Sequence, residues 1–183
     1  MITNDLITLL KSYSGENDPD CSVAEKILNF INITPKPFHR ETSVGHITGS
    51  AWVVNTTYTK ALLTHHKKLG KWLQLGGHAD GDDNILRVAQ RELTEESGLC
   101  DVALLSDEIF DLDVHVIPSR KKEPEHLHYD IRFLFCADDS KPLVVQRSES
   151  HHLQWVDLNE IKDLLTDESV LRMVRKSTKS IRC

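Results

Sequence analysis

The stretch that most constrains this chain runs from residue 76 to residue 99 and reads GGHADGDDNILRVAQRELTEESGL. Its first part is rich in glycine and aspartate, which predicts a loop, and its second part predicts a short helix. Asp82, Asp83 and Asn84 are candidates for the helix N-cap, and Gly98 supplies a left-handed C-terminal stop. We therefore expect a loop followed by one helix with defined ends.

One face of this predicted helix is acidic. Glu92, Glu95 and Glu96 fall within an arc of about 100°, because residues three and four apart are neighbours on a helix. A separate stripe is apolar and is expected to face the core: Leu86, Ala89 and Leu93. Three converging carboxylates repel one another unless a cation lies among them, and hard oxygen ligands suit Mg²⁺ or Mn²⁺. The alternative is a solvated acidic surface.

These residues resemble the Nudix box, G-x5-E-x7-R-E-U-x-E-E-x-G-U, in which U is aliphatic. The matching positions are Gly77, Arg91, Glu92, Leu93, Glu95, Glu96, Gly98 and Leu99. Asp83 stands where the family has its first glutamate, so the carboxylate is kept but its reach is one methylene shorter. In the family that position supports the site rather than serving as the main metal ligand, so we expect a modified site that still works.

The resemblance implies an α/β fold of the Nudix type, an α/β/α sandwich with a mixed β-sheet in which the box forms a strand, loop and helix. It covers residues 41–183 as a Nudix hydrolase domain. Residues 1–40 are expected to be an N-terminal helical extension packed on that domain, in a single globular protein.

The resemblance also implies an activity, the metal-dependent cleavage of a diphosphate bond in a nucleoside diphosphate linked to another moiety. Glu92, Glu95 and Glu96 are then expected to carry Mg²⁺ or Mn²⁺, which lowers the pKa of a bound water and orients it. Gly77 is expected to offer its backbone carbonyl to the same ion. One of these carboxylates, or Glu149 in a later loop, would take the proton from water. Arg91 is expected to orient Glu92.

Histidine and aspartate alternate with apolar residues on two predicted strands, 109–117 and 126–136. If these strands pair as a hairpin, their polar faces coincide. We expect that face to be the wall of a substrate cleft, with substrate contacts from His115, His126, His128 and Asp130. The alternatives are an ordinary solvent-facing surface, which is usually poorer in histidine, and a separate zinc site at His126 and His128.

Two further substrate contacts are expected just before the box. His65 and Lys71 lie in a histidine- and lysine-rich segment that leads directly into Gly76 and Gly77, which suggests that they face phosphate. The alternative is the end of an ordinary strand, with one histidine pointing outward and one inward.

The remaining elements follow from periodicity and from turn residues. Helices are expected at 2–13 and 21–33, and closing helices at 157–165 and 167–176. Further strands are expected at 46–57, 60–64, 102–105, 143–146 and 153–156.

Composition limits the partners and the compartment. The formal net charge of −6 argues against broad attraction to nucleic acid or to an anionic membrane, which leaves a small-molecule substrate. The four cysteines are scattered without a C-x-x-C pair, which favours free thiols in a reducing compartment. The sequence has no signal-peptide pattern and no segment long enough to span a membrane, so we expect a cytoplasmic protein.

Two other functions stay open. The first is a nucleotide-binding or regulatory module of the Nudix fold that does not cleave its ligand. The second is an isomerase of the isopentenyl diphosphate type, which requires a protonating cysteine that no motif here supplies. The substrate is open among several nucleotide classes, and a homodimer, which is common in the family, is also open.

Overall fold

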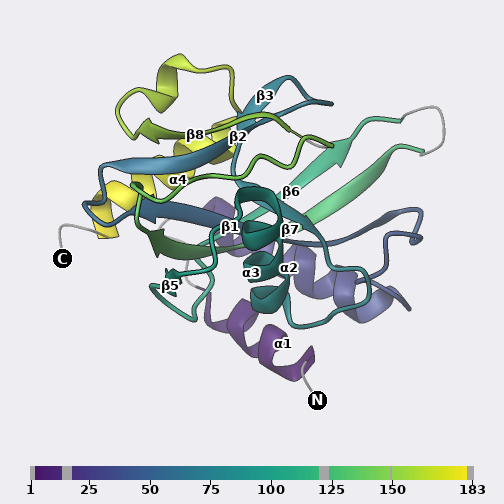
Figure 1. Cartoon of the computed structure of the whole chain (residues 1–183). Coiled ribbons are helices and arrows are strands. Elements are labelled where there is room, and N and C mark those ends of the chain that lie inside the picture. Colours follow the sequence, from purple (N-terminus) through teal and green to yellow (C-terminus); the bar gives the residue numbers. More distant parts are fainter. Residues whose placement is uncertain (1–2, 14–17, 120–123, 149, 181–183) are drawn as a thin grey trace. The chain divides into compact units, whose positions relative to one another are not determined.

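The computed structural model describes residues 3–13, 18–119, 124–148 and 150–180 (Figure 1). The chain divides into two compact units. Unit 1 comprises Met1–Ser50, Gly76–Ala89 and Ser106–Phe133, and unit 2 comprises Ala51–Leu75, Gln90–Leu105 and Leu134–Cys183. Four elements run from one unit into the other: β1 (Gly45–Asn55), β4 (Leu75–His78), α3 (Ile85–Ser97) and β7 (His126–Ala137).

Unit 1 contains the predicted hairpin. Strand β6 (Asp111–Ile117) pairs antiparallel with β7, so that Asp113 lies opposite Asp130 and His115 lies opposite His128. Strand β4 (Leu75–His78), at the start of the acidic stretch, pairs with β1. The expectation that the polar faces of the hairpin coincide is therefore confirmed, because alternation with a period of two brings residues of like position to one face.

The two N-terminal helices also belong to unit 1. Helices α1 (Thr3–Ser12) and α2 (Asp18–Ile33) contact each other, and α2 contacts β6. The rings of Phe30 on α2 and Tyr129 on β7 are stacked, with centroids 3.9 Å apart and an angle of 13° between their planes. Both predicted helices are present, and their apolar stripes are buried, as Leu10 and Ile27 show.

Unit 2 contains a sheet in the order β3-β2-β1-β7-β5, to which β1 contributes residues 51–55 and β7 contributes residues 134–137. Its other strands are β2 (Lys60–His66), β3 (Lys71–Leu73), β5 (Val102–Leu104) and β8 (Ser150–Asp157), and β8 pairs antiparallel with β2. Helix α4 (Glu168–Ser180) is tied to β1 by a hydrogen bond of 2.7 Å from Trp52 Nε1 to Ser177 Oγ. The α/β class and the mixed sheet agree with prediction.

Two predicted elements were wrong. Residues 143–146 form no strand, because the backbone N–H of Val144 donates to the carbonyl of Ser97 at the end of α3, 2.8 Å away. Residues 157–165 form only the single 3₁₀ turn η1 (Ile161–Asp163), because β8 continues to Asp157 and Leu164 returns to an extended conformation. None of the helices in the described ranges is long and apolar enough to cross a membrane.

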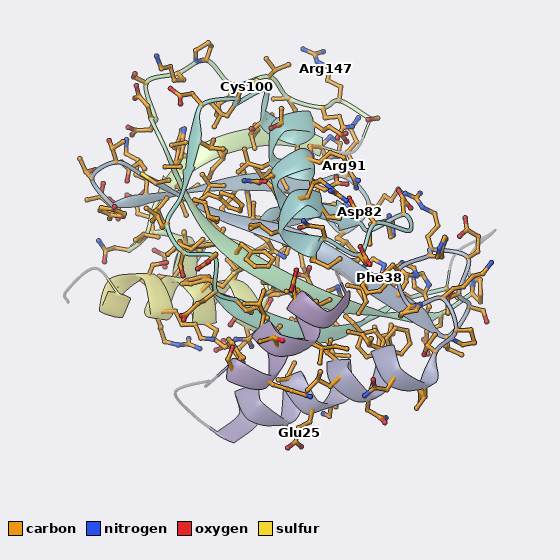
Figure 2. All side chains as sticks on the ribbon, turned by 90° about the horizontal axis from the view of Figure 1, so that it is seen from below. Glu25, Phe38, Asp82, Arg91, Cys100 and Arg147 are labelled. Atoms are coloured by element: carbon orange, nitrogen blue, oxygen red, sulfur yellow. The ribbon has the colours of Figure 1, made fainter. Side chains whose placement is uncertain are left out.

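Cys100 and Cys136 are free thiols, as predicted. Cys100 is exposed and follows helix α3 (Figure 2), whereas Cys136 on β7 is partly buried, and burial raises the pKa of its thiol. Because the thiolate is the nucleophile, we expect iodoacetamide at pH 8 to alkylate Cys100 at least about ten times faster than Cys136. Mass spectrometry of the two peptides measures both rates. Equal rates in native protein would contradict this, and equal rates in urea serve as the control.

Candidate functional site

The loop that leads into helix α3 is fixed by side chains that bond to its backbone. Asp82 Oδ1 accepts a hydrogen bond of 2.9 Å from the N–H of Asn84, and Asn84 Oδ1 accepts one of 3.0 Å from the N–H of Arg87. Asn84 is therefore the N-cap among the three candidates. Arg87 also donates two hydrogen bonds to Asp82, labelled in Figure 2. Gly98, at φ 72°, ends the helix as predicted.

Gly76, the residue just before the box, must be glycine because a side chain there would clash with Ser50. A Cβ on Gly76 would lie 2.2 Å from Ser50 Oγ and 2.8 Å from Ser50 Cα, so β4 approaches β1 more closely than any side chain allows. Asp83, at the position of the family's first glutamate, lies near the beginning of α3. It lines a cavity of about 400 Å³ together with Asp5 and Thr8 of α1.

The three glutamates of α3 differ in their environments. Glu96 is buried, at 5% exposure, the Glu92 side chain is 14% exposed, and the Glu95 side chain is 53% exposed. Arg91 Nη2 donates a hydrogen bond of 2.8 Å to Glu92 Oε1, and Arg91 Nε lies 3.8 Å from Glu95 Oε1. The expected contact between Arg91 and Glu92 is thus present. A buried carboxylate one turn from another is costly unless cations accompany it.

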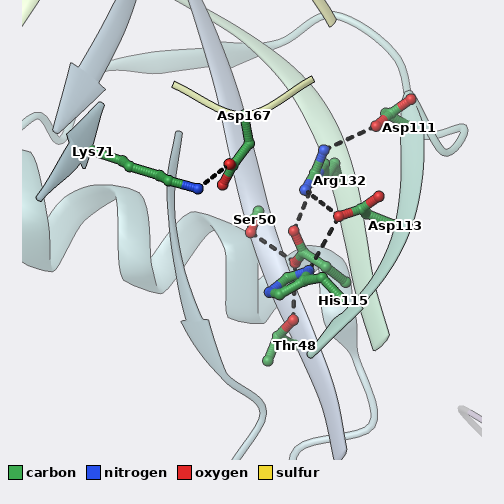
Figure 3. Close-up of polar contacts among 9 residues, drawn as sticks. Thr48, Ser50, Lys71, Asp111, Asp113, His115, Arg132 and Asp167 are labelled. Carbon is green, nitrogen blue, oxygen red and sulfur yellow. Dashed lines mark hydrogen bonds and ion pairs between the residues drawn. The ribbon is translucent and has the colours of Figure 1, made fainter. Parts of the chain in front are cut away.

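Arg132 is the centre of a buried ion network on the hairpin (Figure 3). Its guanidinium is 1% exposed and lies 2.7 Å from Asp130 Oδ2, 3.0 Å from Asp111 Oδ2 and 3.4 Å from Asp113 Oδ2. Burial lowers the pKa of Arg132, but the three carboxylates outweigh burial and raise it. Like charges opposite each other destabilise a sheet, so Arg132 is what makes the pairing of Asp113 with Asp130 tolerable.

Asp130 lies in the interior. Its Oδ1 accepts hydrogen bonds from Thr48 Oγ1 at 2.9 Å and from Ser50 Oγ at 2.7 Å, while its Oδ2 accepts from Arg132. Both carboxylate oxygens are therefore used within unit 1. This arrangement suits a residue that holds β1 to β7 better than one that meets substrate, the role predicted for it.

Five histidines gather beside this network. The Nε2 atom of His128 lies 3.1 Å from Nε2 of His46 and 3.3 Å from Nε2 of His126. The ring centroids of His78 and His115 lie 5.1 Å and 5.5 Å from that of His128. The pKa of His46 is lowered to about 4 and that of His128 to about 2. Burial is the main cause of both shifts, and the neighbouring histidines add to it.

Sequence reasoning missed two members of this group, His46 and His78. A signal for His46 was present, because His46, Thr48 and Ser50 alternate along a predicted strand and so form a polar face. His78 stands inside the box at a position where the pattern specifies no residue type. His78 approaches the hairpin because β4 pairs with β1. The sequence of so short a strand does not indicate which strand it pairs with.

The predicted substrate contacts of unit 2 have partners within that unit. Lys71 forms an ion pair with Asp167. The His65 ring lies against Trp72, with centroids 5.1 Å apart, and near the rings of His151 and His152. Glu149, the predicted alternative base, lies outside the described residues.

Comparison with known proteins shows which family the chain belongs to. The sequence profile of the NUDIX domain matches residues 46–176, which is most of the chain. The Bacillus subtilis protein YvcI, an uncharacterized Nudix hydrolase, is 28% identical over 109 residues, which are 59% of this chain. The chain spans 65% of that relative's length, slightly less than two thirds.

Two solved structures resemble the fold. An Ap4A hydrolase of C. elegans matches with a TM-score of 0.60 and 13% identity over 74% of this chain and 97% of its own. The MutT protein of Methanosarcina mazei matches with a TM-score of 0.56 and 17% identity over 78% of this chain and 99% of its own. At these identities the likeness shows the fold, and the expected fold is confirmed.

Proposed function

Because the chain belongs to the Nudix family, we propose that it is a hydrolase of diphosphate bonds in nucleoside diphosphates linked to another moiety. The observation that carries the proposal is the set of carboxylates on α3. Glu96 is buried and Glu92 is nearly so, one turn apart on the same helix, and an arginine is hydrogen-bonded to Glu92. A structural surface helix does not need a buried carboxylate in such a position.

The carboxylates of α3 fit a divalent cation with oxygen ligands, Mg²⁺ or Mn²⁺. Such an ion, when bound, neutralises charge on the diphosphate and lowers the pKa of a coordinated water. Glu92 and Glu96 would hold it, and Gly77 is a further ligand by resemblance. Glu95, the most exposed of the three, is suited to accept the proton from water.

Arg91 is a positioning residue in this proposal. Its guanidinium lies between Glu92 and Glu95, hydrogen-bonded to the first and 3.8 Å from the second. It therefore restricts the rotamer of Glu92 and offsets the repulsion between the two carboxylates. His65 stays a proposed substrate contact in unit 2, and so does Lys71, whose ammonium would have to leave Asp167 to reach phosphate.

The N-terminal boundary proposed for the domain has one support from comparison. The matched profile begins at residue 46, so α1 and α2 lie before it and residues 1–40 are proposed as a helical extension. A homodimer also stays a prediction, which light scattering on the native protein tests.

The alternatives are less well supported. A module that binds without cleaving would not need the buried Glu96 with Glu92 one turn away. An isomerase of the isopentenyl diphosphate type needs a protonating cysteine in a recognisable motif, which neither the exposed Cys100 nor the partly buried Cys136 provides. Isomerisation also releases no phosphate, so analysis of products distinguishes the three functions.

The test is release of phosphate or of a nucleotide product from a panel of substrates with Mg²⁺, with Mn²⁺ and with chelator. The panel contains nucleoside triphosphates, nucleotide sugars, ADP-ribose, CDP-linked alcohols and dinucleoside polyphosphates, the last because a structural neighbour is an Ap4A hydrolase. We expect turnover of at least one class that chelator abolishes. Binding of nucleotide without turnover of any class would favour the regulatory module.

A further inference from the structure

Imidazoles from three strands converge in unit 1. His46 lies on β1, His78 at the end of β4 and His128 on β7. One ring nitrogen from each of these residues lies within 4.8 Å of the corresponding nitrogens of the other two. His126, two residues before His128 on the same face of β7, adds a fourth ring, with its centroid 5.0 Å from that of His46.

The Nε2 atoms of His46, His126 and His128 compete for protons. His126 Nδ1 lies 2.9 Å from the carbonyl of Pro124, which can only accept, so the proton of a neutral His126 is on Nδ1 and its Nε2 carries a lone pair. His128 Nε2 faces that lone pair at 3.3 Å and also faces His46 Nε2 at 3.1 Å. A single proton on His128 Nε2 would have to be shared between the Nε2 atoms of His46 and His126. A proton on His46 Nε2 would instead point at the proton on His128 Nε2.

A cation at the centre resolves this conflict, because every converging nitrogen then presents a lone pair. In a tetrahedral site with Zn–N bonds of about 2.0–2.1 Å, neighbouring ligand nitrogens lie about 3.3 Å apart. The observed separations of 3.1 Å and 3.3 Å have that size. We propose that His46, His78 and His128 bind a transition-metal ion of the zinc class, with His126 as the fourth ligand.

The chemistry of the ligands selects the metal. Imidazole nitrogen suits Zn²⁺, Co²⁺ and related ions, whereas Mg²⁺ and Mn²⁺ prefer oxygen. The site therefore differs in kind from the carboxylates of α3, and it does not depend on the proposed hydrolase function. The Pro124 carbonyl supplies the outer hydrogen bond that orients His126, an arrangement typical of metal-bound histidine.

Four protein ligands close a zinc site, which then acts on stability rather than on substrate. The ion would join β1, β4 and β7 in unit 1. The histidines that we predicted as cleft-wall contacts, His126 and His128, take the role of metal ligands in this proposal. His115 is held differently, because its Nδ1 lies 3.1 Å from Asp113 Oδ2 in the arginine network.

The experiment titrates the chelator-treated full-length protein with Co²⁺ and records its visible absorption, then displaces Co²⁺ with Zn²⁺. We expect one equivalent of Co²⁺ to give the intense bands of tetrahedral coordination, and one equivalent of Zn²⁺ to remove them and raise the melting temperature. His128→Ala and His78→Ala are each expected to weaken binding at least about 100-fold, because the site keeps only three of its four nitrogen ligands.

Two control variants separate this site from other features. His39→Ala removes a half-buried histidine of the same unit and should leave the Co²⁺ spectrum unchanged. Glu96→Gln should also leave the Co²⁺ spectrum unchanged. Failure of the proposed hydrolase function and failure of the proposed histidine site are therefore distinguished by separate measurements. Circular dichroism reports folding of each variant, and His78→Ala serves if His128→Ala does not fold. Absence of tetrahedral bands in the native protein, or their persistence in both histidine variants, would overturn the proposal.

Discussion

Replacing Arg132 by methionine is expected to lower the free energy of unfolding by about 3–5 kcal/mol, the range found when one partner of a buried ion pair is removed. The methionine fills much of the same volume, so the loss is chiefly electrostatic. Asp111 is fully buried and Asp130 is 2% exposed, and both would lose the guanidinium that neutralises them. Asp113, opposite Asp130 in the hairpin, would add repulsion.

Urea denaturation followed by circular dichroism measures this change. The matched control is Arg87→Met, because Arg87 is also bonded to an aspartate in unit 1 but its side chain is 59% exposed. Solvent and salt screen exposed pairs, so the urea midpoint of Arg87→Met should stay close to that of the native protein. Adding Asp111→Asn to Arg132→Met should recover part of the loss. Equal midpoints for the two arginine variants would show that the network is not a source of stability.

The elements with strong local signals were predictable. The ends of helix α3 were predictable, because the Asn84 side-chain cap before it and the left-handed Gly98 after it act over only three or four residues. The pairing of β6 with β7 was also predictable, because any slip by one residue would turn Leu112 and Ile131 out of the core.

What could not be predicted depends on contacts between distant segments. Val144 lies in an apolar run typical of a strand, yet its backbone bonds to the end of α3. Asp130 looks like an exposed polar residue of an alternating strand, but β1 brings Thr48 and Ser50 to it. The sequence places His46 on the polar face of a predicted strand, but it does not indicate that His46 and His78 both approach His128, since no local rule fixes which strand pairs with β1.

Glu96→Gln is expected to lower kcat by at least about 100-fold, in line with the loss of one strong electrostatic contribution to a transition state. Glutamine has nearly the shape of glutamate, so it keeps the packing of a side chain that is 5% exposed. It removes the negative charge that a divalent cation needs from an oxygen ligand.

The assay compares the variant with native protein on the best substrate of the panel, at saturating Mg²⁺ and across a Mg²⁺ titration. Glu25→Gln, an exposed change on helix α2, serves as the control and should turn over at the native rate. Glu95→Gln gives a second comparison, because a base that does not hold the ion should lose turnover without a change in the Mg²⁺ midpoint. Near-native turnover in Glu96→Gln would contradict the assignment of the catalytic site to the carboxylates of α3. Lost turnover with an unchanged Mg²⁺ midpoint would instead assign Glu96 to proton transfer, and the ion to the other carboxylates.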